Sequence, residues 1–184
     1  MLLSLLQRRR SIRQFQPRPV EVEKVQLLAE ALLRAPSSRG RNPWEFVVVD
    51  DAETLQALSR AKAHGSAFLD GAPLAVVLCG DPERSDVWIE DCAIAAIILQ
   101  LTAESLGLAS CWVQIRLRLN RDGRTAEDYL RPLIGLPERL RVLAIVGIGY
   151  PAEVKSGHAR ESLEWGKLHL NQFGAGWPSG TSPK

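Results

Sequence analysis

Four arginines near the start of the chain could hold an anionic ligand. They surround Ser11 and are Arg8, Arg9, Arg10 and Arg13. Arginine stays charged at any physiological pH and presents a planar fork of N–H donors, which suits phosphate groups and delocalised anionic rings. A solvated basic face or a nucleic-acid patch would use the same residue type. The whole chain carries 23 basic and 21 acidic residues, so the charge is local and favours a small anionic ligand over nucleic acid.

A second polar segment, residues 36–44, could form a cradle for the same kind of ligand. It contains Ser37, Ser38, two arginines and Asn42, and it leads directly into the apolar run 46–49. Hydroxyl and guanidinium groups suit a phosphorylated ligand. Serine, glycine, asparagine and proline are also typical of any surface turn, so an ordinary turn is an equal alternative on these residues alone.

The apolar pattern predicts the elements that must position these segments. Helices are expected at residues 21–34, 51–61 and 86–106 and in a shorter stretch ending near Leu133, with strands at 46–49, 74–79, 109–113 and 142–146. The order mixes α and β without a strict βαβ repeat. The strands are almost wholly apolar, which is typical of a sheet covered on both faces. The helix at 86–106 is apolar over most of its circumference, so we expect it to be buried nearly all round.

Length and composition indicate an ordinary globular chain with one core. It has 184 residues, of which 46% are hydrophobic. We expect a single domain over residues 1–173 and a Gly/Pro-rich tail over 174–184. The three cysteines, Cys79, Cys92 and Cys111, lie among apolar neighbours and are expected to be buried thiols in a reducing compartment. The sequence shows no leader pattern and no apolar stretch long enough to span a membrane, which predicts a cytoplasmic protein without a membrane partner.

The segment after Pro151 combines apolar residues with a polar, glycine-containing background. The apolar members are Leu163, Trp165, Leu168, Leu170 and Phe173. Exposed apolar residues on a terminal arm need a surface to cover them. A partner subunit is the economical choice, and folding back on the same chain is the alternative.

Four segments, in this order and at these spacings, match one family. They are Arg9-Arg10-Ser11-Ile12-Arg13-x-Phe15, Pro36-Ser37-Ser38 through Pro43-Trp44, Asp91-x-x-x-Ala95 through Ser110-Cys111-Trp112, and Gly149-Tyr150-Pro151-Ala152-Glu153. Together they resemble the FMN-dependent nitroreductase family over nearly the full chain, from Leu5 to about Phe173. The resemblance implies an α+β fold in which helices flank a central, mostly antiparallel sheet. It also implies an intertwined homodimer with one FMN in each of two interfacial sites.

The resemblance further implies which residues bind FMN. The N-terminal motif would contact the phosphate and the pyrimidine end of the ring, and the Pro-Ser-Ser segment would come from the other subunit. The backbone that follows Leu106-Gly107-Leu108 would pass the reactive edge of the ring. The matching residues are Arg9, Arg10, Ser11 and Arg13; Pro36, Ser37, Ser38 and Asn42; Trp112, Val113, Gln114 and Ile115; and, for the phosphate, either Lys155 or Arg160. Gly40 departs from the asparagine often found there in the family and cannot make a side-chain bond to the ring.

The implied chemistry belongs to the flavin, so no catalytic side chain is expected. A guanidinium near N1 and O2 favours the reduced anion, and Arg10 and Arg13 are the candidates for this role. NAD(P)H would bind transiently over the ring, followed on the same face by a small acceptor such as a nitroaromatic or a quinone, which implies ping-pong kinetics. The alternatives are a related flavoenzyme for dehalogenation or flavin breakdown, and an FMN-binding module without turnover.

Other residues that could carry chemistry favour structural roles. Cys111 has no partner at Cys-x-x-Cys spacing and no nearby histidine, so a packed strand cysteine is the better interpretation. Glu90 and Asp91 begin the long helix, where carboxylates interact favourably with the helix dipole. No metal is expected, because no consistent ligand spacing joins the histidines His64, His158 and His169.

Overall fold

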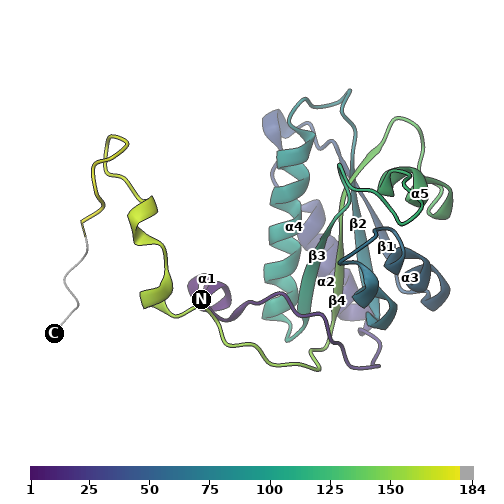
Figure 1. Ribbon diagram of the computed structural model, residues 1–184, viewed down its shortest axis with the longest axis horizontal. Helices are drawn as coiled ribbons and strands as arrows, with labels where there is room; N and C mark the ends of the chain where they lie inside the picture. Colours follow the sequence, from purple (N-terminus) through teal and green to yellow (C-terminus); the bar gives the residue numbers. More distant parts are fainter. Residues whose placement is uncertain (179–184) are drawn as a thin grey trace.

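The computed structural model describes residues 1–178, which are built around one four-stranded antiparallel sheet (Figure 1). Its strands are β1 (Trp44–Val49), β2 (Leu74–Gly80), β3 (Ala109–Gln114) and β4 (Arg141–Gly149), in the spatial order β1-β2-β4-β3. All four expected strands are confirmed, each within a few residues of its predicted bounds. Because β4 pairs with both β2 and β3, strand β3 lies at one edge of the sheet.

Helices cover both faces of the sheet, which confirms the predicted α+β fold (Figure 1). One face carries α2 (Val22–Leu33) and α4 (Trp88–Ser105), and the other carries α3 (Ala52–Ser59), the 3-10 helix η2 (Ala67–Gly71) and α5 (Ala126–Leu133). Alternate residues of β2 point to opposite faces, so Val76 joins the core of α2 and α4 while Val77 joins that of α3 and α5. Every residue of β2 is buried, which explains its wholly apolar sequence.

Short polar residues set the helix starts. The Asp51 carboxylate accepts the Thr54 N–H at 2.8 Å at the start of α3, and the Thr125 hydroxyl accepts the Asp128 N–H at 3.0 Å at the start of α5. Each cap satisfies a backbone donor that the helix itself leaves without a partner. These bonds fix the loops on which the residues discussed below lie.

All three cysteines are buried and free, as predicted. None of the helices within residues 1–178 has the length and apolar composition needed to cross a membrane.

Helix α4 differs from its prediction. One side packs into the core through residues such as Cys92, Ala95 and Leu99, none of which is exposed. On the other side, Ile94 and Ile97 are each 40% exposed. The expectation that α4 is buried nearly all round is therefore wrong for the single chain, since nothing in residues 1–178 covers this outer face.

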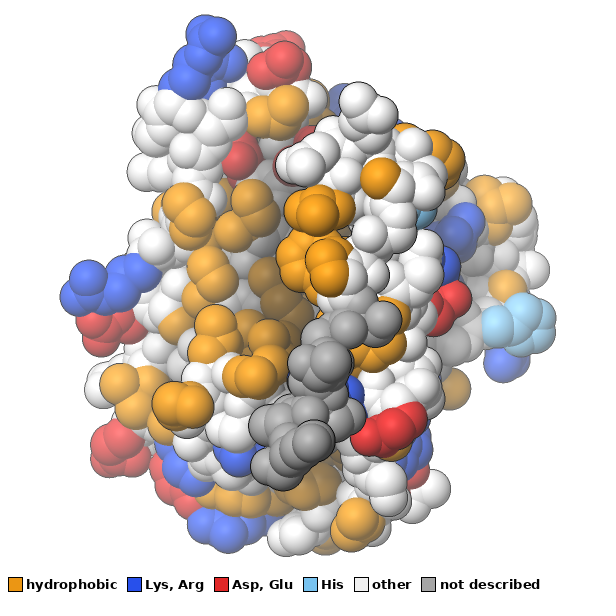
Figure 2. Space-filling model, turned by 90° about the vertical axis from the view of Figure 1, so that its left-hand side faces the viewer, with side chains coloured by type: hydrophobic (Ala, Val, Ile, Leu, Met, Phe, Trp, Pro, Cys, Tyr) orange, Lys and Arg blue, Asp and Glu red, His pale blue; other side chains and the backbone are white. Residues whose placement is uncertain are grey.

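Two terminal segments also leave apolar side chains uncovered. Helix α1 (Leu2–Arg8) was not predicted, and it lies against α4, where the Arg8 Nε is 2.9 Å from the Glu104 Oε1. The chain after Pro151 leaves the body as an arm containing η3 (Arg160–Ser162) and η4 (Trp165–Lys167) (Figure 1). The arm does not fold back on the body, and its five apolar side chains listed above stay at least 41% exposed. Figure 2 shows hydrophobic side chains gathered along a hollow on the face from which the arm projects.

Candidate functional site

The basic N-terminal segment lies beside the start of β3. Ser11 forms a bridge with Ser110, and the Ile12 N–H donates to the Ser110 carbonyl at 3.2 Å. Burial raises the pKa of the Cys111 thiol, and the nearby charges of three basic residues, Arg13, Lys155 and Arg9, oppose that rise. Cys111 is therefore packed, as predicted, at the end of β3 near these three basic residues.

A cavity of about 370 Å³ opens at this end of the sheet. Its lining includes Arg8, Arg10, Gly107, Glu153 and Lys155. The structure thus brings two sequence-distant groups into one place, the arginines before β3 and the lysine after β4. We call this site the basic cavity.

Glu153 holds the two sides of the basic cavity together. Its carboxylate accepts the Arg13 backbone N–H at 2.7 Å and the Lys155 ammonium at 3.0 Å, and these bonds hold the pKa of Glu153 below its usual range. Lys155 also donates to the Ser11 carbonyl at 3.1 Å, and the Arg10 guanidinium donates to the Ser156 carbonyl. In the sequence, Glu153 stands out only as the last residue of the motif Gly149-Tyr150-Pro151-Ala152-Glu153. Its positioning role depends on contacts that only the folded chain shows.

The two candidates for holding a phosphate occupy different places. Lys155 lines the basic cavity. Arg160 lies on the arm, where its guanidinium carbon is 5.0 Å from the centre of the Trp165 ring. Within the single chain, only Lys155 joins the N-terminal arginines.

Hydrogen bonds between its two ends hold the polar loop of residues 36–42 together. The Ser37 hydroxyl accepts the Asn42 N–H at 2.8 Å and donates to the Asn42 Oδ1 at 2.6 Å. Gly40 has a φ of +64°, a conformation that glycine adopts freely and asparagine tolerates better than most residues. The backbone of this loop therefore explains a glycine at position 40 without any contact to a ligand.

Asp91 ties the polar loop to α4. It lies in the first turn of the helix, as predicted, and is only 3% exposed. Its Oδ1 accepts the Ser38 N–H at 2.8 Å, and its Oδ2 accepts the Ser85 hydroxyl at 3.4 Å. Sequence reasoning assigned Asp91 to the helix dipole alone and missed that it anchors the loop.

We expect Asp91→Ala to lower the free energy of unfolding by about 2 kcal/mol, because the Ser38 N–H and the Ser85 hydroxyl lose their acceptor. Asp91→Asn is the matched control, since its amide oxygen can still accept the Ser38 N–H. Urea denaturation of the two variants and the wild type measures the difference. Equal stability of all three proteins would contradict an anchoring role for Asp91.

The basic cavity and the polar loop lie at opposite ends of α4. Ser38 is bonded at the N-terminal end of the helix, whereas Arg8 pairs with Glu104 at the C-terminal end. A helix of 18 residues is about 27 Å long. One mononucleotide cannot reach both groups in the same chain, so the single chain contains two separate parts of the predicted site.

The segment Trp112–Ile115 can offer only some of its groups to a ligand. Val113 and Ile115 are each 1% exposed and pack in the core of α3 and α5, while the Trp112 Nε1 donates to the Gln114 Oε1 at 3.1 Å. The N–H groups of Ile115 and Arg116 both donate to the Leu143 carbonyl. The side chains of Val113 and Ile115 are therefore out of reach of a ligand, whereas those of Trp112 and Gln114 are only half-buried.

Leu117 is a residue that sequence reasoning missed. Its φ is +59°, its side chain is 78% exposed, and its N–H donates to no group among residues 1–178. Positive φ is costly for a branched residue and often marks a functional position. Only the backbone conformation gives this signal, since nothing in the sequence around Leu117 calls for a strained turn.

Comparison with known proteins gives a consistent result. A protein-family model with the description "Nitroreductase family" matches residues 6–150 of the chain. A solved structure of an FMN-dependent nitroreductase from Clostridium difficile R20291 has a TM-score of 0.91 at 44% identity, and the match covers 93% of this chain and 99% of that one. An Archaeoglobus fulgidus protein with the provisional name NADH dehydrogenase/NAD(P)H nitroreductase is 36% identical over 83% of this chain and 87% of its own length. The NADPH:FMN oxidoreductase of Vibrio harveyi, solved with NAD⁺, has a TM-score of 0.77 at 25% identity, with 94% of this chain and 77% of that one covered.

Proposed function

Because the chain belongs to the nitroreductase family, it is an NAD(P)H-dependent flavin oxidoreductase with FMN as cofactor, and we propose that its acceptors are small electrophiles such as nitroaromatics and quinones. The observation that carries this proposal is the basic cavity beside β3, which Arg10 and Lys155 line and whose Glu153 bonds the backbone of Arg13. Donor and acceptor would use one face in turn, which gives ping-pong kinetics.

The residues of the basic cavity fit FMN. The FMN phosphate needs cationic donors, which Arg10 and Lys155 of the lining provide together with the neighbouring Arg9. The pyrimidine end of the ring suits the guanidinium of Arg10, or that of Arg13 next to the cavity. When bound, FMN contributes the two-electron redox chemistry. Glu153 fixes the backbone of Arg13, so that the nearby guanidinium can stabilise negative charge at the pyrimidine end. Trp112 and Gln114, joined by their hydrogen bond, would shape the wall of the site.

We infer that the functional unit is a homodimer in which the polar loop of a second copy completes each basic cavity. The separation of the two groups by the length of α4 supports this arrangement. Ile94, Ile97 and the apolar side chains of the arm supply uncovered surface of the kind that subunit interfaces bury. In this dimer, Pro36, Ser37, Ser38 and Asn42 of one copy would face Arg9, Ser11 and Arg13 of the other.

The acceptor range is proposed to be broad. Between β3 and β4 the chain has only short loops and the eight-residue helix α5, which leaves little material for a lid. Leu117 stays exposed at the end of the predicted ring-edge segment. An open site tolerates acceptors of different shape, and activity confined to one of the nitroaromatic, quinone and enone classes would contradict this.

The test is an anaerobic absorbance spectrum of the purified protein before and after addition of NADH or NADPH, with the released cofactor identified by chromatography. We expect one FMN per chain, bleached by a nicotinamide nucleotide and reoxidised by quinones and nitroaromatics. A colourless protein that refuses added FMN would overturn the assignment of the basic cavity. FMN that is consumed during reaction with oxygen would indicate flavin breakdown instead.

Lys155 rather than Arg160 is proposed to hold the phosphate, because only Lys155 lines the basic cavity. We expect Lys155→Ala to raise the dissociation constant for FMN roughly tenfold, the loss expected for one hydrogen bond to a charged group. Arg160→Ala, which removes the same charge, is expected to change it less than about twofold. Titration of the apoprotein with FMN, followed by flavin fluorescence, measures both. The opposite ranking would assign the phosphate to Arg160.

A further inference from the structure

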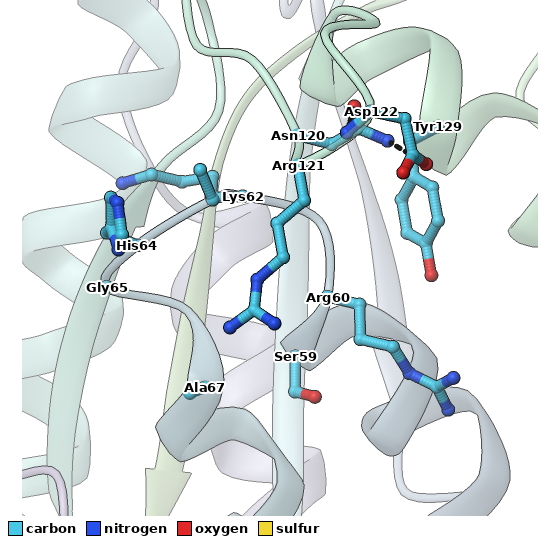
Figure 3. Close-up of a pocket in the computed structure, with 11 residues that line it drawn as sticks. Ser59, Arg60, Lys62, His64, Gly65, Ala67, Asn120, Arg121, Asp122 and Tyr129 are labelled. Carbon is cyan, nitrogen blue, oxygen red and sulfur yellow. Dashed lines mark hydrogen bonds between the residues drawn. The ribbon is translucent and has the colours of Figure 1, made fainter.

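A second cavity, of about 420 Å³, lies on the face of the sheet that carries α3 and α5 (Figure 3). One wall is the loop between α3 and η2, and the other is the loop of residues 120–122 between β3 and α5. Figure 3 shows Lys62 ending beside His64, and Arg121 extending into the space between the two loops. Arg60, at the rim, turns away along α3, where its guanidinium bonds Gln56.

Basic side chains in the lining of the second cavity have no anionic partner among the described residues. Among residues 1–178, the side chains of Lys62, His64 and Arg121 make no ion pair and no hydrogen bond. The single carboxylate in the lining, Asp122, is occupied, because it accepts the Asn120 amide at 3.3 Å and lies 3.6 Å from the Arg124 guanidinium. The cavity therefore presents cations that a ligand could satisfy.

Burial and the nearby charge of Arg118 lower the pKa of Lys62. Both effects disfavour the charged ammonium in the free protein. A bound anion would act in the opposite direction and stabilise that ammonium.

The walls of the second cavity are held in place before any ligand arrives. The buried Ser66 hydroxyl donates to the Ser59 carbonyl at 2.7 Å and closes the first loop. The Asn120 Oδ1 accepts two backbone N–H groups of the second loop at 3.0 Å each. The Ala63 N–H donates to the Leu119 carbonyl at 3.2 Å and joins the two loops. A preformed site loses less conformational entropy on binding.

The two loops that form the second cavity are linked to the segments assigned to FMN by residues next to its lining. After the first loop, Phe68 of η2 lies 6.3 Å, centre to centre, from Phe15, which is two residues from Arg13. On the other side, the Arg118 N–H donates to the carbonyl of Ile115, the last residue of the predicted ring-edge segment. A ligand that occupied both sites would extend from the flavin region into this cavity.

We propose that the second cavity binds a phosphate group of the nicotinamide nucleotide donor through Lys62 and Arg121. The inference rests on the proposed function, because it assigns a recognition site to the donor of that reaction. An ammonium and a guanidinium fork are the groups that bind phosphate most strongly in proteins. The phosphate is either the diphosphate shared by NADH and NADPH or the 2′-phosphate present only in NADPH, and the experiment distinguishes them.

The experiment measures flavin bleaching at increasing NADH or NADPH in stopped flow, with the FMN-loaded protein. We expect Lys62→Ala and Arg121→Ala each to raise the half-saturating donor concentration roughly tenfold, with an unchanged limiting rate. Arg60→Ala is the matched control, since it removes a cation of the rim that points away, and it is expected to stay within about twofold. Bleaching by dithionite and the FMN content should be the same in all four proteins.

A higher half-saturating concentration for both donors would show that the second cavity binds the diphosphate. A higher half-saturating concentration for NADPH alone would show that it binds the 2′-phosphate. Unchanged half-saturation in Lys62→Ala and Arg121→Ala, with normal bleaching of the wild type, would overturn the site and leave the proposed function intact. If no donor bleaches the wild type, the proposed function fails. In that case calorimetry with ADP and adenosine 2′,5′-bisphosphate still tests the cavity, because binding to the wild type that both variants lose supports it and equal or absent binding overturns it.

Discussion

A protein carrying Ile94→Glu and Ile97→Glu is expected to be monomeric and to lose nearly all of its FMN while keeping its fold. Both side chains are 40% exposed on the outer face of α4, so the single chain loses little packing, and the expected change in its stability is within about 0.5 kcal/mol. In the proposed dimer the same face is buried, where two unpaired carboxylates are strongly unfavourable. Sedimentation velocity measures the oligomeric state, urea denaturation the free energy of unfolding, and flavin absorbance the FMN content.

The matched control for this prediction is Val22→Glu with Leu27→Glu. These residues are 67% and 47% exposed on α2, so the variant also places two carboxylates on exposed apolar positions of a helix. We expect the control to remain dimeric and yellow. A dimeric, FMN-loaded Ile94→Glu/Ile97→Glu protein would show that the outer face of α4 is not the interface.

The second large effect is expected at Gly147 in β4. A Cβ there would lie 2.8 Å from the Leu69 Cδ2 and 2.9 Å from the Phe68 ring, so no side chain fits without moving η2. We expect Gly147→Val to lower the free energy of unfolding by about 3 kcal/mol, the upper range for overpacking a core. It should also weaken FMN binding, because Phe68 packs against Phe15 near the basic cavity. Urea denaturation and FMN titration measure the two effects.

A graded series separates crowding from a general effect of losing glycine. Gly147→Ala is expected to lower the free energy of unfolding by about 1 kcal/mol, which is less than the effect of Gly147→Val. Gly71→Ala, in η2 itself, should be close to neutral, because its added Cβ would meet nothing within 4 Å. A Gly147→Val protein as stable as the Gly71→Ala control would contradict the close packing of η2 on β4.

The main helices and strands could be predicted because their residues carry the signal locally. The strand β2 is an apolar run between Pro73 and Gly80, and α2 has a helical apolar period that ends before Pro36. The sequence did not predict α1, whose leucines mostly stay exposed and so show no core-facing stripe. For α4, the apolar pattern records how much surface must be covered but not which chain covers it.

The candidate site also combines features that residue type indicates with contacts that only the folded chain shows. The cluster of arginines and the polar loop could be singled out from residue type, although residue type alone left an ordinary turn as an equal alternative for the loop. The anchoring of the loop by Asp91 and the clamp made by Glu153 join residues 53 and 140 positions apart, so they exist only in the folded chain. The residues predicted to bind FMN stay a prediction, and the Lys155→Ala and Arg160→Ala variants test the choice between the two candidates for the phosphate.

The length of α4 has a consequence for how the holoenzyme forms. In the proposed dimer, each FMN site combines the basic cavity of one copy with the polar loop of the other, which lie at opposite ends of α4. FMN and the second copy then bind cooperatively, because each strengthens the binding of the other. The yield of loaded sites then depends on protein concentration as well as on FMN. Newly made chains at low abundance would stay empty, and activity per chain would rise as the protein accumulates.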